Sequence, residues 1–166
     1  NRCFNITGCC NPQEHYMVNL DHRLAQIKEM VDKGQYFCIN HGQQYGKTTI
    51  LKALQAYLKE EYAVIRIDFQ FISTPEFATE SVFVKALARL LWSRYRREMP
   101  GEIEEQIKQI KQSLNHTEVD LFTVLSRWCA VSSKPIILIV DEADHPGNSQ
   151  TFLDFLAQLR GRFLAR

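Results

Sequence analysis

Two short stretches hold residues whose types suit chemistry on a bound phosphate chain. "GKTT", residues 46–49, offers a glycine, a lysine and two hydroxyls, and "IVDEAD", residues 139–144, offers adjacent carboxylates. A polyphosphate must be held by backbone N–H groups and cations, and its metal ion needs oxygen ligands. The chemistry indicated is therefore binding of a nucleoside triphosphate, with cleavage of its terminal phosphate.

The first stretch predicts the phosphate-binding loop. Lys47 can reach the β- and γ-phosphates and stabilise charge during their cleavage, and the Thr48 hydroxyl can coordinate Mg²⁺. The full P-loop signature also has a glycine five residues before Gly46, but His41 stands there and Gly42 lies one residue late. The residues expected to contact the nucleotide are Gly42, Gln44, Tyr45, Gly46, Lys47, Thr48 and Thr49.

The second stretch predicts a metal ligand and a general base. Asp141 can hold Mg²⁺ opposite Thr48, directly or through water, and Glu142 can orient and deprotonate the attacking water. An acidic strand end alone is usually a solvated turn, so this interpretation depends on the pairing with "GKTT". Asp144 and His145 are explained more simply by turn solvation or helix capping, and Asp68 by a turn at the end of its strand.

The elements that must position these residues follow from hydrophobic periodicity. Strands are expected at 35–40, 62–69 and 134–142, and helices at 20–31, 50–58, 76–98, 103–114, 121–128 and 149–165. Alternating strands and helices indicate βαβ units, hence a three-layer α/β/α P-loop NTPase fold with a parallel sheet. Carboxyl ends of parallel strands share one edge, so Lys47 and Asp141 are expected to meet there. Residues 1–17 are expected to form an irregular arm, and 18–166 the domain.

Composition limits the classes of partner that the chain is expected to bind. The 166 residues carry a net charge of +1, which provides no broad attraction to nucleic acid or anionic membranes, and no apolar run is long enough to span a bilayer. The basic–aromatic stretch "LWSRYRRE" leaves nucleic acid possible, although Trp92 and Tyr95 are expected to pack inward. The stripe Ile103, Ile107, Ile110 and Leu114 is expected to lie on the core rather than to dock a partner.

The cysteines indicate a reducing compartment. There are five, and the start of the sequence lacks the apolar region of a signal peptide, which favours the cytoplasm. Cys38 and Cys129 are expected to be small core residues. The spacing of Cys3, Cys9, Cys10 and His15 matches no common zinc pattern.

The letters D-E-A-D at 141–144 also occur in a large helicase family. Such a helicase should contain T-G-x-G-K-T, P-T-R-E-L-A and S-A-T, whereas this chain has "HGQQYGKTT" and neither of the other two. The similarity to helicases is limited to these four letters and G-K-T.

Over most of its length the chain resembles another group, the AAA-like ATPase domains of many bacterial proteins, related to STAND and Orc-type P-loop ATPases. The resemblance is carried by 4–40 with "QQYGKTT", "IVDEAD" and "LDFLAQLRG". It implies that Gly46, Lys47 and Thr48 are the Walker A residues, that Asp141 and Glu142 are the Walker B pair, and that the ligands are ATP and Mg²⁺. It also implies an adenine-contacting segment at His15, Tyr16 and Met17, although a hydrophobic staple explains Tyr16 as well.

Two departures from that group matter. Its members often carry arginines in the loop, where this chain has His41 and Gln43. The group's sheet also has a later strand, with a polar sensor residue, beyond the helix at 149–165. We therefore expect a fragment that lacks its later strands, with a downstream domain of the parent chain as partner, marginal stability and poor activity.

Three functions remain open from sequence. The first is ATP binding with Mg²⁺-dependent hydrolysis, and the second is a nucleotide-gated regulatory module with little or no turnover. The third is a motor or nuclease partner stimulated by nucleic acid. The oligomeric state has no sequence signal.

Overall fold

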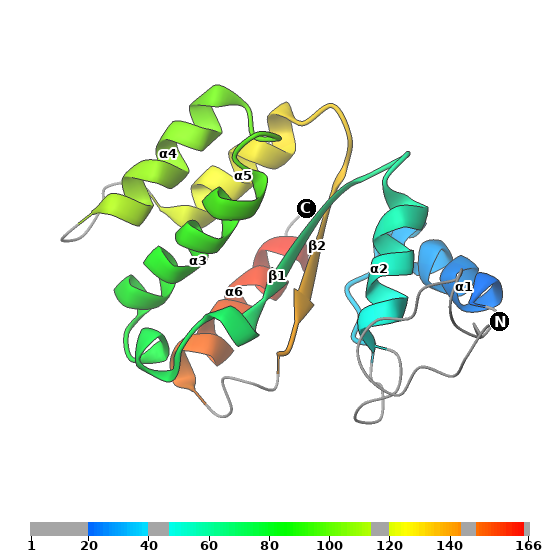
Figure 1. Ribbon diagram of the computed structural model, residues 1–166, viewed down its shortest axis with the longest axis horizontal. Helices are drawn as coiled ribbons and strands as arrows, with labels where there is room; N and C mark the ends of the chain where they lie inside the picture. Colours follow the sequence, from blue (N-terminus) through cyan, green and yellow to red (C-terminus); the bar gives the residue numbers. More distant parts are fainter. Residues whose placement is uncertain (1–19, 40–46, 114–119, 144–148, 165–166) are drawn as a thin grey trace, which may run out of the picture. The chain divides into compact units, whose positions relative to one another are not determined.

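The computed structural model describes residues 20–39, 47–113, 120–143 and 149–164, and the chain divides into two compact units, residues 1–61 and 62–166. The first unit contains α1 (Asp21–Asp32) and α2 (Lys47–Leu58). The second contains β1 (Ala63–Asp68), η1 (Phe69–Phe71), η2 (Thr74–Phe77), α3 (Glu80–Tyr95), α4 (Gly101–Gln112), α5 (Leu121–Val131), β2 (Ile136–Asp141) and α6 (Gln150–Leu164). Figure 1 labels the helices and strands of both units.

The first unit is a contacting pair of amphipathic helices. Leu24 and Ile27 are the buried residues of α1, and α2 buries one face that includes Leu54 and Leu58. Lys28 on α1 also reaches Glu61, just after α2, at 3.0 Å, and Asp32 at 2.9 Å. The hydrogen bonds to Asp32 and then to Glu61 raise the pKa of Lys28 above its ordinary value.

The strand expected at 35–40 is absent from the described part of that segment. Residues 35–39 have no regular secondary structure, and Tyr36 and Ile39 are exposed. An apolar run becomes a strand only when a neighbour completes its ladder of hydrogen bonds. None of the described strands pairs with these residues, since the sheet consists of β1 and β2 alone.

The second unit is built on a two-stranded parallel sheet. β1 and β2 pair in register from Ala63 opposite Ile136 to Asp68 opposite Asp141, and α3, α4 and α5 form the crossover between them. The expected α/β class with a parallel sheet is confirmed. Because the strands are parallel, both carboxyl ends lie at the same edge.

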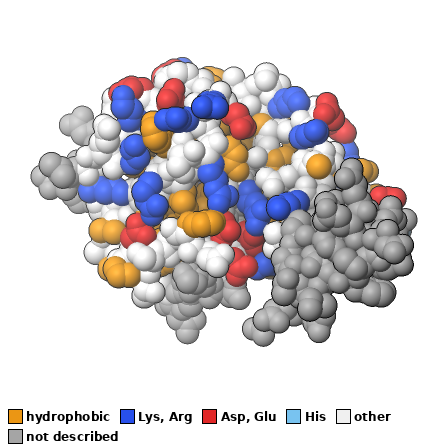
Figure 2. All heavy atoms as spheres, viewed as in Figure 1, with side chains coloured by type: hydrophobic (Ala, Val, Ile, Leu, Met, Phe, Trp, Pro, Cys, Tyr) orange, Lys and Arg blue, Asp and Glu red, His pale blue; other side chains and the backbone are white. Residues whose placement is uncertain are grey.

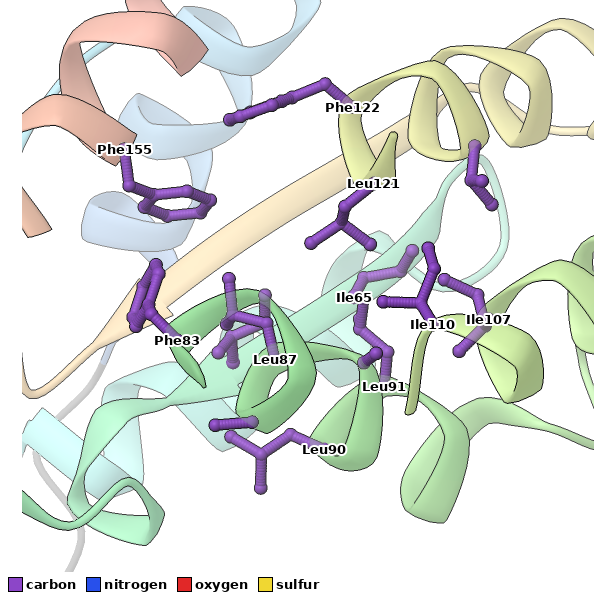
Figure 3. Close-up of a cluster of buried hydrophobic side chains, with 14 of the residues drawn as sticks. Ile65, Phe83, Leu87, Leu90, Leu91, Ile107, Ile110, Leu121, Phe122 and Phe155 are labelled. Atoms are coloured by element: carbon purple, nitrogen blue, oxygen red, sulfur yellow. The ribbon is translucent and has the colours of Figure 1, made fainter. Parts of the chain in front are cut away.

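One face of this sheet packs on the hydrophobic core. Ile65 and Ile67 of β1 belong to the core, and alternate residues of β2, including Leu138 and Val140, pack against it. Figure 1 shows α3 to α6 on one side of the strand pair, and Figure 3 shows the side chains that fill the space between them. The isoleucines of the expected stripe, Ile103, Ile107 and Ile110, are fully buried there, which confirms their place on the core, while Leu114 lies outside the described residues. A side chain of this size contributes about 1.5–3 kcal/mol when fully buried.

An aromatic cluster anchors the chain just beyond β1. Phe69 is fully buried, and its ring lies 5.0 Å from that of Phe152 on α6 and 6.0 Å from that of Phe83 on α3, measured between centroids. The sheet edge that ends in Asp68 is therefore supported by rings from both helices.

The free edge of β1 is covered by a side chain. The Arg66 amide donates to the Tyr95 hydroxyl at 2.7 Å, and that hydroxyl donates to the Arg66 carbonyl at 3.2 Å. Buried backbone groups need such partners. Tyr95, at the end of α3, therefore satisfies both backbone groups of Arg66.

The long helix expected at 76–98 is interrupted near its start. η2 ends at Phe77, and α3 begins at Glu80 with Thr79 as its N-cap, whose hydroxyl accepts the Val82 amide at 3.3 Å. A threonine hydroxyl satisfies a first-turn amide best from outside the helix, so Thr79 favours a new start.

Candidate active site

The phosphate-loop side is described from Lys47 onward. α2 is described from Lys47, so Lys47, Thr48 and Thr49 form the first turn of its described part, as expected for residues that follow a phosphate loop. Thr48 is exposed and Lys47 is partly buried. First-turn amides lack partners inside the helix, and the helix dipole adds partial positive charge at this end. The other expected nucleotide contacts, Gly42, Gln44, Tyr45 and Gly46, lie outside the described residues, as do His15, Tyr16, Met17, Asp144 and His145.

The acidic side is built on the end of β2. Asp141 is the last residue of the strand and is 5% exposed, the one buried charged residue among those that the structure describes. Burying a carboxylate is costly unless it is paired or hydrogen-bonded. Its Oδ1 accepts the Glu142 amide at 2.9 Å, and its Oδ2 accepts the guanidinium of Arg66.

Glu142 leaves the strand in an unusual backbone conformation. Its φ is +53°, in the left-handed region that residues other than glycine rarely adopt. Such strain persists where the surroundings require it, often at functional sites. Here the positive φ follows directly on the last residue of β2, so the chain leaves the strand direction immediately after the sheet.

Arg66 is a component of the site that sequence reasoning missed. It lies on β1 on the face opposite Ile65 and Ile67, and its side chain is 13% exposed. The sequence feature that could have pointed to it is a single cationic residue inside the β-branched run "YAVIRIDF". Its partner depends on strand order and register, which a single sequence does not reveal.

Asp68 ends β1 directly opposite Asp141. Its Oδ1 accepts the Gln70 amide at 3.0 Å, so it is the N-cap of η1. The chain therefore turns directly after the strand, as expected, with Asp68 as a cap that the sequence did not predict, and the same carboxylate also lies at the edge that Asp141 occupies.

The residues at this edge suit a hard divalent cation. Carboxylate oxygens are the ligands that Mg²⁺ prefers, and both Asp141 oxygens are already oriented by hydrogen bonds that still leave acceptor capacity. Among the described residues no group of three or more histidine, cysteine or acidic side chains converges as a metal site. This fits Mg²⁺, which usually takes one or two carboxylates and completes its shell with water and phosphate. Lys47 belongs to the first unit and Asp141 to the second, and their convergence on one nucleotide stays a prediction.

The basic–aromatic stretch on α3 has a structural role. Trp92 and Tyr95 pack against the core, and the Trp92 ring is covered by Arg96 at 4.7 Å and by Lys111 at 3.7 Å from its centroid. Such cation–π contacts use the ring face that a nucleic-acid base would need. Figure 2 shows basic and acidic side chains interspersed on the visible face, in keeping with the balanced net charge.

The expected core position of the two described cysteines is wrong. Cys38 and Cys129 are both exposed. Cys38 lies in the segment that forms no strand, and Cys129 follows the buried Trp128 on α5, about 100° further around the helix.

Comparison with known protein families gives a match. A family model described as an AAA domain matches residues 31–164, a span that includes both "GKTT" and "IVDE". No curated protein and no solved structure matches the chain. No helix within the described ranges is both long and apolar enough to cross a bilayer.

Proposed function

The chain belongs to the AAA domain family, and we propose that it binds ATP with Mg²⁺ and hydrolyses it at a site formed by "GKTT" and "IVDE". The observation that carries the proposal is the family match, which spans both stretches. Two local features support it: Lys47, Thr48 and Thr49 are helical at the N-terminal end of the described part of α2, and Asp141 ends β2 at the carboxyl edge of a parallel sheet. Ligands of open α/β sheets bind at that edge.

Each residue has a distinct role in the proposal. The first turn of α2 and the Lys47 ammonium hold the β- and γ-phosphates, and Thr48 and Asp141 hold the metal ion. Bound Mg²⁺ neutralises charge that develops on the phosphate oxygens.

The Glu142 carboxylate orients a water molecule in line with the γ-phosphate and accepts its proton. The water oxygen forms a bond to phosphorus as the bond to the β-phosphate oxygen breaks, so the products are ADP and inorganic phosphate. Positioning and electrostatics supply most of the acceleration.

The test of nucleotide binding is titration of the protein with a methylanthraniloyl-labelled ATP in the presence of Mg²⁺. Lys47→Ala should weaken binding at least tenfold, because a buried charge-assisted contact contributes about 1.5–3 kcal/mol. Lys52→Ala is the matched control, since Lys52 is an exposed lysine on the same helix. Equal loss of affinity in both variants, or in neither, would reject the assigned phosphate site.

The second candidate function is a nucleotide-gated module with little or no turnover. It is favoured by the incomplete loop signature, with His41 in place of the first glycine. Phosphate release under saturating Mg²⁺ and ATP separates the two functions. Release that Glu142→Gln abolishes supports hydrolysis, whereas Lys47-dependent binding without release supports the gated module.

A further inference from the structure

The carboxylate proposed to hold the metal ion already has a cation beside it. Arg66 donates from Nη2 to Asp141 Oδ2, and the two side chains are 13% and 4% exposed. The register of the sheet explains the contact, because Arg66 lies opposite Ile139 and two positions before the partner of Asp141. Diagonal neighbours on one sheet face are within reach of a long side chain.

The contact engages the metal-binding atoms themselves. Asp141 Oδ2 accepts from Arg66 while Oδ1 accepts from the Glu142 amide at 2.9 Å. A divalent cation that binds Asp141 therefore meets a guanidinium at the same carboxylate. Two cations at one carboxylate repel each other, most strongly where water is excluded.

The pair is also incomplete on the arginine side. Arg66 Nε is buried and has no hydrogen-bond partner within the described residues, so the contact is not the two-pronged arginine–carboxylate bridge. A buried donor without a partner is costly, which lowers the cost of moving the guanidinium to another acceptor. Asp68 is such an acceptor, because it lies two residues along β1 on the same face of the sheet.

We propose that Arg66 is a resident counter-ion that competes with Mg²⁺ for Asp141 and thereby sets the metal concentration at which the site forms. This inference rests on the proposed function, since it concerns the same metal ion. Arg66 keeps the buried carboxylate neutralised until the metal–nucleotide binds, and the guanidinium then moves toward Asp68. If Asp141 is paired with Arg66 about nine-tenths of the time, the apparent metal affinity falls about tenfold.

The experiment measures how binding of a methylanthraniloyl-labelled ATP depends on Mg²⁺ concentration in the wild type and in Arg66→Gln. The Mg²⁺ concentration at half-maximal binding should fall about tenfold in Arg66→Gln, while binding in EDTA should be unchanged. A readout without nucleotide is the melting temperature: Mg²⁺ alone should raise it more in Arg66→Gln, in which the guanidinium no longer competes for Asp141, than in the wild type.

Two further variants serve as controls. Arg89→Gln removes an arginine of the same unit that pairs with Glu76 at 3.0 Å, and it should leave the Mg²⁺ dependence unchanged. Arg66→Lys keeps a cation at the position and should stay close to the wild type, and it also serves if Arg66→Gln does not fold. In that case the Mg²⁺ requirement of Arg66→Lys is compared with that of Arg89→Gln. An equal or higher requirement supports the proposal, and a lower one overturns it.

The outcomes separate this inference from the proposed function. A tenfold fall in the Mg²⁺ requirement of Arg66→Gln supports the inference. Binding that depends on Lys47 but shows the same or a higher Mg²⁺ requirement in Arg66→Gln overturns the inference and leaves the proposed function standing. Absence of any binding that depends on Lys47 overturns both.

Discussion

Asp68 and Asp141 are register partners, so two carboxylates end neighbouring parallel strands at one edge of the sheet. Their surroundings differ. Asp68 caps η1 through the Gln70 amide, whereas Asp141 is buried and contacts Arg66 and the Glu142 amide. The two positions therefore form a natural pair of variants in which one carboxylate is the proposed metal ligand and the other is its neighbour.

We expect Asp141→Asn to raise the Mg²⁺ requirement for ATP binding about 10- to 100-fold, the usual cost of losing a carboxylate that supports a metal ion. The asparagine oxygen can still accept a hydrogen bond from the Arg66 guanidinium, so the fold should survive. Asp68→Asn keeps the capping oxygen and should change the requirement much less. A larger effect at Asp68 than at Asp141 would contradict the assignment of the ligand.

Glu142→Gln should retain ATP binding and lose turnover. The amide keeps the size of the side chain but does not accept the proton of the attacking water, and general-base catalysis typically contributes about 10²- to 10⁴-fold. Phosphate release under single-turnover conditions measures the loss. Hydrolysis at the wild-type rate would show that another group acts as base.

The aromatic cluster predicts a large difference in stability between two nearby phenylalanines. Phe69→Ala should lower the free energy of unfolding by about 3–5 kcal/mol, because its buried ring contacts α3 and α6. Phe71 is 53% exposed, and the Arg94 guanidinium lies over its ring at 5.0 Å from the centroid. Phe71→Ala should cost about 1 kcal/mol or less, mostly from that cation–π contact. Urea denaturation monitored by circular dichroism compares the two, and similar losses would contradict the described core.

The environment of Glu76 predicts that part of the protein's stability is lost in acid. Burial opposes its ionisation, but hydrogen bonds from Ser73 and an ion pair with Arg89 outweigh burial and lower its pKa below the ordinary value. A lowered folded-state pKa contributes stability that is complete above the unfolded glutamate pKa of about 4.3 and is lost as the pH falls through the lower folded value.

Glu76→Gln should therefore lower the free energy of unfolding at pH 7, by up to about 1 kcal/mol for a partly exposed pair, and should make it less dependent on pH below about 4.3. The measurement is urea unfolding across that range of pH. Glu98→Gln, an exposed glutamate on the same unit, is the control and should follow the wild type. Parallel pH profiles for Glu76→Gln and the wild type would contradict the role of this carboxylate.

The sequence predicted the elements whose signals are local. The run "IILIVD" is β2 with Asp141 at its end, and the isoleucines of α4 form the buried stripe that their spacing indicates. Residues 35–40 have the same apolar character as a strand, but a strand also needs a neighbour, and no periodicity provides one. Arg66 was missed for a related reason. It lies 75 positions before Asp141 in the sequence, and the contact between them arises from the register of two paired strands.

The proposed function requires that Lys47–Thr49 and the end of β2 bind the same metal–nucleotide. Its most direct test is paramagnetic broadening of backbone amide signals by a trace of Mn²⁺–ATP in a nuclear magnetic resonance spectrum. The amides of Lys47 to Thr49 and those of Asp141 and Glu142 should broaden together, while those of Glu98 and Val131 should not. Broadening at one of the two stretches without the other would contradict it.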